Sequence, residues 1–143
     1  MAGVSLAAAR RIVAAVFKRG AEDGLRPLSV CVLDAGGHLI AFERQDGASP
    51  MRFQIAHGKA HGAVALGLGS RAIMARAEAQ PHFVSAVNGA LGGALVPVPG
   101  GVLIRAVSGE VLGAVGVTGD SSDNDEAAAV AAIEAEGLLA DPG

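Results

Sequence analysis

The sequence of 143 residues contains no tryptophan, no tyrosine and only four phenylalanines, so aromatic side chains are scarce. Proteins that bind single-stranded nucleic acid stack its bases on aromatic rings, and this chain has too few rings to form such a surface. An excess of positive charge is also absent, because 14 acidic and 11 basic residues give a formal net charge of -3. Since binding to a phosphate backbone depends on clustered basic residues, we expect no nucleic-acid partner.

Cysteine is almost absent too, because Cys31 is the single one in the sequence. One cysteine excludes an internal disulfide and a metal site built from several thiolates. Long apolar runs are missing, and none approaches the ~20 residues that a membrane-spanning helix requires. The segment from Met1 to Phe17 carries Arg10 and Arg11 in its middle, whereas a secretory signal has its positive charge first. These features predict a cytoplasmic protein with no membrane partner.

Hydrophobic residues make up 51% of the chain and charged residues 17%, which is typical of a folded protein. At this length we expect a single domain over residues 1–143. Caps and turn residues predict helices over 5–24, 49–67 or 49–69, 70–79, 81–91 and from Ser121 or Ser122 to about Leu138. Strands are predicted over 28–33, 38–44, 102–106 and 111–117. This order, without βαβ units, indicates an antiparallel sheet covered by helices.

Two histidines are the sharpest chemical feature of the sequence. His57 and His61 are four residues apart on the predicted second helix, so they share a face with Phe53. Two imidazoles at this spacing can bind one metal ion, or one can ligate a haem iron while the other stays nearby. The metalloprotease motif is not present, because no glutamate follows the first histidine. The alternative is a pair of histidines on a partly exposed helix face that binds nothing.

Small residues surround these histidines. Gly58 and Gly62 share another face of the helix, and a glycine there costs about 1 kcal/mol relative to alanine. The cost indicates a close neighbour, which is a strand, another subunit or a flat ligand. Lys59 faces a different way, and its small neighbours leave its stem uncovered. It either holds a carboxylate, forms a Schiff base if desolvated, or is an ordinary solvated lysine.

Further candidate binding residues lie outside the second helix. Arg44 can bind an anion through two hydrogen bonds, or it can form a surface ion pair with Asp46 or Glu43. His82 can supply a third nitrogen if the fold brings it near the other histidines, and is otherwise solvated. The pair Gly100–Gly101 offers backbone N–H groups that can bind an anion, although it matches no phosphate-binding motif.

Several segments together resemble one known protein family. They are Val32–Leu39, Arg44–Ala48, Ile55–Ala60, Pro99–Val102, Gly113–Gly119 and Asp125–Glu126. Over about Ser5 to Leu138 the sequence is similar to the GlcG/HbpS-like family, which includes the C-terminal domain of PduO-type proteins. The resemblance implies an α/β, profilin-like fold with a five-stranded antiparallel sheet flanked by helices. It also implies a homo-oligomer.

Family members include haem-binding proteins and proteins that resemble enzymes of small organic acids, so the resemblance leaves three hypotheses open. The first is a small-molecule-binding protein, with haem or another tetrapyrrole as the ligand and His57 or His61 as the iron ligand. The second is a cofactor-free isomerase, hydrolase or cyclase, in which Lys59 and Arg44 position a carboxylate-bearing metabolite and a histidine moves a proton. The third is an oligomeric scaffold without chemistry of its own. Where the family often has threonine, this chain has Gly62.

Overall fold

The computed structural model describes residues 3–143, and its strands form one five-stranded antiparallel sheet in the order β2-β1-β4-β3-β5. The strands are β1 (Ser29–Asp34), β2 (Leu39–Arg44), β3 (Gly101–Arg105), β4 (Val111–Thr118) and β5 (Leu139–Asp141). The helices are α1 (Leu6–Glu22), α2 (Arg52–Leu66), α3 (Ser70–Ala79), α4 (Pro81–Ala90) and α5 (Ser122–Glu134). The expected α/β class with a five-stranded antiparallel sheet is confirmed.

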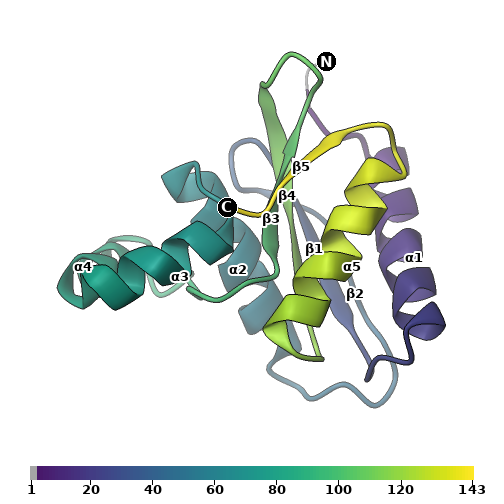
Figure 1. The fold of residues 1–143 in the computed structure, drawn as a ribbon, viewed down its shortest axis with the longest axis horizontal. Helices are drawn as coiled ribbons and strands as arrows, with labels where there is room; N and C mark the ends of the chain where they lie inside the picture. Colours follow the sequence, from purple (N-terminus) through teal and green to yellow (C-terminus); the bar gives the residue numbers. More distant parts are fainter. Residues whose placement is uncertain (1–2) are drawn as a thin grey trace.

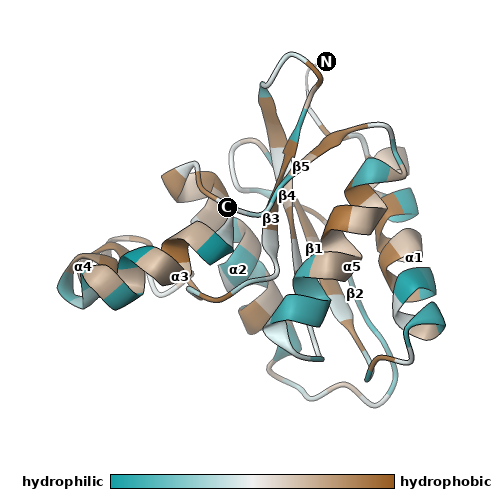
Figure 2. Cartoon of the chain, viewed as in Figure 1, coloured by the Kyte–Doolittle hydropathy of each residue, from teal (hydrophilic) through white to brown (hydrophobic). Residues whose placement is uncertain are grey.

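Helices cover both faces of the sheet (Figure 1). On one face, α1 and α5 lie side by side over the larger apolar core, which includes Val30, Val32, Val102, Ile104, Val115 and Val117. On the other face, α2 packs over a smaller core, which includes Cys31, Leu33, Leu103, Ala114, Ala56, Ala60 and Ala63. Figure 2 shows mainly hydrophobic residues along β3 and β4, as expected for strands buried on both faces. The α3–α4 pair extends away from the sheet.

Two helices begin where their capping residues predict. At the start of α1, the Ser5 hydroxyl accepts the backbone N–H of Ala8 at 3.1 Å. At the start of α5, the Ser121 hydroxyl accepts the N–H of Asn124, also at 3.1 Å. Each bond satisfies a donor that the helix itself leaves free.

Among residues 3–143 no helix is both long and apolar enough to cross a bilayer.

Two expected helix boundaries are wrong. The second helix begins at Arg52, later than expected, because the Ser49 hydroxyl accepts from the Arg52 side chain at 2.9 Å and does not cap the helix. The last helix ends at Glu134 rather than near Leu138, since Gly137 adopts the left-handed φ of 73°. The chain then forms β5, which pairs with β3 at the sheet edge. This three-residue strand is too short to show an alternating pattern in the sequence.

Strand glycines allow α2 to lie very close to the sheet. A Cβ atom on Gly116 of β4 would overlap the backbone oxygen of Ala56, and one on Gly101 of β3 would overlap that of Lys59. Any side chain at these two positions would push the helix away, because protein interiors have no spare volume. The close helix–sheet packing expected from the sequence is therefore present, and the glycines of the strands permit it.

Candidate functional site

Four rings from α2 and β2 form a continuous row, which we call the ring row: Phe42, Phe53, His57 and His61. The rings of Phe42 and Phe53 meet edge to face with centroids 4.9 Å apart. Phe53 stacks on His57 at 5.5 Å, and His57 stacks on His61 at 5.2 Å. The spacing of four residues along α2 produces this stack, and all four side chains are partly exposed. The structure thus brings together the two histidines and the phenylalanine that the sequence singled out.

The ring of His61 is oriented by a backbone carbonyl. Its Nδ1 lies 2.9 Å from the oxygen of Ala94, and a carbonyl oxygen only accepts, so Nδ1 carries the proton. Nε2 then carries the lone pair that a metal ion would use. A Cβ atom on Gly37, in the turn between β1 and β2, would lie 3.7 Å from this Nε2. The turn therefore lies against this edge of the ring, and a side chain at position 37 would crowd it.

The pKa of His57 lies below that of a free imidazole. Burial lowers the pKa of His57, and repulsion from His61 lowers this pKa further. The planes of the two imidazoles are inclined by only 22°, and each lone pair lies in its own ring plane. Nearly parallel planes do not converge on one ion within bonding distance, so the two histidines are not arranged to chelate a metal ion together. Among residues 3–143 no group of three metal-binding side chains occurs either. The donor set therefore fits a metal that takes one imidazole, as a haem iron does.

Gly58 and Gly62 are buried beneath the loop that follows α4. A Cβ atom on Gly58 would lie 2.6 Å from a methyl group of Val96, and one on Gly62 would overlap the side chain of Leu95. The N–H of Val96 also donates to the oxygen of Gly58 at 3.1 Å. The close neighbour predicted for this face is therefore the chain's own loop, and neither glycine faces an open surface. A side chain at position 62 would require Leu95 to move.

Lys59 points into the interior on the sheet side of α2 and is 2% exposed. Its Nζ donates to the oxygen of Val117 at 2.9 Å and to Asp125 at 3.2 Å. Burial lowers the pKa of Lys59 and raises the pKa of Asp125, and in each case it outweighs the attraction between them. The ammonium is neither solvated nor directed toward the ring row. The enzyme hypothesis requires Lys59 and Arg44 to lie close together, and the structure does not place them so.

Gly100 and Gly101 belong to this interior. A Cβ atom on Gly100 would lie 2.8 Å from Nζ of Lys59, and the N–H of Gly101 donates to the Ser70 hydroxyl at 2.7 Å. Both glycines are buried. Because this N–H is satisfied within the protein and the backbone is covered, the pair does not form the exposed anion site considered from the sequence.

Arg44 and Asp46 lie at the opposite end of the ring row from His61 and are exposed. They help to line a cavity of about 620 Å³, together with Phe17, Gly20, Ala21, Leu25, Arg26, Pro27, Glu43 and Gln45. In the part of the chain that the structure describes, Arg44 forms no ion pair with Asp46 or Glu43. His82 is exposed at the start of α4 and is not a member of the ring row.

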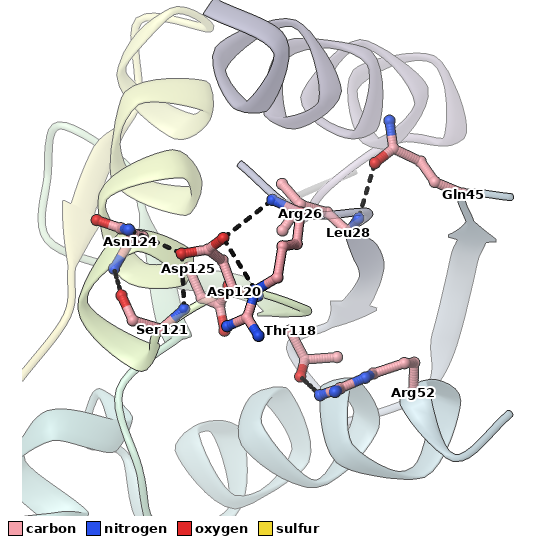
Figure 3. A network of polar contacts seen from close by, with 9 residues as sticks. All are labelled: Arg26, Leu28, Gln45, Arg52, Thr118, Asp120, Ser121, Asn124 and Asp125. Atoms are coloured by element: carbon pink, nitrogen blue, oxygen red, sulfur yellow. Dashed lines mark hydrogen bonds and ion pairs between the residues drawn. The ribbon is translucent and has the colours of Figure 1, made fainter. Parts of the chain in front are cut away.

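Sequence reasoning missed the buried carboxylate of Asp125. This residue lies in the first turn of α5, and Figure 3 shows it beside Asp120 in a polar network. A signal for it was available, because Asp125 precedes Ala128, Ala129 and Ala132 at steps of three, four and seven residues, the spacing of one helix face. An acidic residue within an apolar helix face predicts a buried partner of opposite charge.

The comparisons with known proteins agree with the resemblance. The family model described as "Haem degrading protein HbpS-like" matches residues 4–134. A 15.0 kDa uncharacterized protein in the dhaT-dhaS intergenic region of Citrobacter freundii is 29% identical over 136 residues, which are 94% of this chain and 92% of the relative. The crystal structure of a PduOC:Heme complex has a TM-score of 0.84 at 24% identity, covering 95% of this chain and 96% of that chain. A double mutant of HbpS from Streptomyces reticuli has a TM-score of 0.79 at 26% identity, covering 94% and 88%. The chain therefore belongs to the HbpS-like family.

Proposed function

We propose that this protein binds haem, or a tetrapyrrole of the same shape, on the ring row, with a histidine of α2 as the iron ligand. The observation that carries the proposal is the orientation of His61, whose Nδ1 is held by the oxygen of Ala94 at 2.9 Å. A metal-binding histidine usually donates its second ring nitrogen in this way. Membership of the HbpS-like family and the likeness to the PduOC:Heme complex support the same ligand.

The rest of the ring row suits the ring of a tetrapyrrole. Phe42 and Phe53 present partly exposed apolar rings beside the histidines, and aromatic surfaces attract flat apolar ligands. His57 stacks on His61 and extends the flat surface beside it. Bound haem would supply an iron with its own redox chemistry, while the chain binds and orients it.

Titration of the purified protein with haemin tests this function. We expect the Soret band to shift on binding in the wild type, and we expect His61→Ala to lose the shift that reports histidine ligation. His57→Ala is expected to weaken binding, because it removes the ring that stacks on His61. His82→Ala is the matched control, since this histidine is exposed and lies outside the ring row. Identical spectra for all four proteins would remove the histidine assignment.

We also infer that the protein forms a homo-oligomer through α4. Only Val84 of this helix is buried, while the apolar side chains of Phe83 and Val87, and of Leu91 just after the helix, are covered in part. Apolar side chains left partly exposed on a projecting helix are typical of an interface. Light scattering coupled to size exclusion should give a multiple of 14.1 kDa, and a monomer would contradict the inference.

The cytoplasmic location predicted from the sequence remains part of this proposal, and cell fractionation tests it.

A further inference from the structure

Arg52 is a partly buried cation without a carboxylate partner. Its Nε donates to the hydroxyl of Ser49 and its Nη1 to the hydroxyl of Thr118, each at 2.9 Å, as Figure 3 shows for the second bond. Within residues 3–143 neither Arg52 nor Arg44 forms an ion pair. A guanidinium that is partly desolvated and bonded only to neutral oxygens is left with unbalanced charge, which favours binding of an anion.

The sheet register places Arg44 at the same end of the molecule as Arg52. Arg44 pairs with Ser29 across β2 and β1, and Ser29 pairs with Thr118 across β1 and β4. These three residues form the last row of the sheet at this end, and Arg52 binds that row through Thr118. In the middle of the row, the hydroxyl of Ser29 is buried and has no hydrogen-bond partner. Two arginines without acidic partners and one unpartnered hydroxyl therefore gather in one place.

This arginine end is continuous with the ring row. Phe42 lies two residues before Arg44 on β2, so both lie on the face of the sheet that α2 covers. On α2, Arg52 directly precedes Phe53 of the ring row, but a step of five residues turns it ~140° away from His57, toward the sheet, where it bonds Thr118. No acidic residue occurs in α2. A ligand that covers the ring row thus meets histidines toward one end and approaches Arg44, beyond Phe42, at the other, and α2 places no negative charge between them.

We propose that Arg44 and Arg52 form the carboxylate-binding end of the ring row, so that the site selects a flat apolar ring system that carries carboxylates. The proposal rests on the proposed function and adds to it the residues that recognise the acidic groups of the ligand. A guanidinium holds a carboxylate through two parallel hydrogen bonds, and Arg52 is already oriented by Ser49 and Thr118.

Haemin and haemin dimethyl ester, titrated in the same dilute detergent buffer, distinguish this proposal from haem binding alone. The ester has the same ring and iron but no carboxylate. We expect the wild type to bind haemin about tenfold more tightly than the ester, the size of one charge-assisted hydrogen-bonded contact. Arg52→Gln and Arg44→Gln should each reduce this preference severalfold by weakening haemin binding while leaving the ester unaffected. Arg10→Gln, which changes an exposed arginine of α1, should leave the preference intact.

The outcomes separate the two proposals. Equal affinity of the wild type for the acid and the ester, or an unchanged preference in both variants, would overturn the role of the arginines and leave haem binding intact. Absence of binding by either form would overturn the proposed function and the inference with it. Arg44 is exposed, so Arg44→Gln gives a folded test protein even if Arg52→Gln is unstable.

Discussion

The ammonium of Lys59 lies 3.2 Å from the carboxylate of Asp125, and these side chains are 2% and 1% exposed. Lys59 belongs to α2 and Asp125 to α5, so the ion pair joins helices from opposite faces of the sheet (Figure 1). The second oxygen of Asp125 accepts the N–H of Asp120 at 3.0 Å, and Lys59 also donates to Val117. This pair connects the two helical layers around the end of β4.

Removal of the Asp125 charge should destabilise the protein strongly. Asp125→Asn leaves the Lys59 ammonium buried without a counter-charge, and breaking a buried pair in this way costs ~3–5 kcal/mol. Urea unfolding measures the difference in the free energy of unfolding. Asp123→Asn is the control, because its carboxylate is 79% exposed and pairs with Arg71 at the surface, where the cost is ~1 kcal/mol or less. Equal effects of the two substitutions would contradict a structural role for the buried pair.

Asp120 should make the stability of the protein sensitive to acid. Its carboxylate accepts the backbone N–H groups of Arg26 at 2.9 Å and of Ser121 at 2.8 Å, and the side-chain amide of Asn124 at 2.8 Å. These bonds hold the pKa of Asp120 far below its ordinary value. A group whose pKa is lower in the folded chain stabilises the fold. Its contribution is fully present above the pKa of the unfolded chain, ~3.9 for aspartate, and is lost as the pH falls toward the pKa of the folded chain.

Urea midpoints measured from pH 6 to pH 2 check this contribution. We expect Asp120→Asn to unfold more readily than the wild type near neutral pH and to show a smaller loss of stability on acidification. Asp46→Asn, which changes an exposed carboxylate, should follow the wild-type curve. Parallel curves for Asp120→Asn and the wild type would show that Asp120 does not provide this pH dependence.

Two glycine-to-alanine substitutions should have opposite signs. Gly116→Ala places a methyl group against the backbone of α2. It should lower the free energy of unfolding by ~2 kcal/mol or more, because the helix must move. Gly89→Ala lies in α4, where nothing occupies the space of the new methyl group, and should stabilise the protein by ~0.5–1 kcal/mol. Thermal unfolding compares the two variants. A stable Gly116→Ala protein would refute the close approach of α2 to the sheet.

His57 should remain neutral to lower pH than a free imidazole. Burial lowers its pKa most, and the second cause is repulsion from His61. Proton NMR titration of His61→Gln should therefore show a pKa of His57 that rises but stays below the ordinary value of ~6.5. Because the folded-state pKa is the lower one, protonation favours the unfolded chain, and stability should fall as the pH drops below ~6.5. An unchanged His57 titration in the variant would contradict the proximity of the two rings.

Local sequence signals predicted most of the elements but not the surroundings of α2. Ser5 and Ser121 mark helix starts that the structure confirms, because a cap acts within three residues of itself. The close packing expected at Gly58 and Gly62 is real, yet the neighbour is a loop about 35 residues later in the chain. The periodicity of a helix does not indicate which distant segment packs on its face. The sequence pattern therefore could not predict Leu95 and Val96 as the neighbours.

The sequence by itself determined the order of helices and hairpins, the face of α2 that carries His57 and His61, and the family resemblance. These properties depend on spacing along the chain, which fixes local geometry. Only the tertiary structure decided that Lys59 is buried against Asp125 and that Arg44 and Arg52 lie at the same end of the sheet. The burial of a charge and the partner that balances it depend on which distant residues the fold brings together, and no local pattern contains that information.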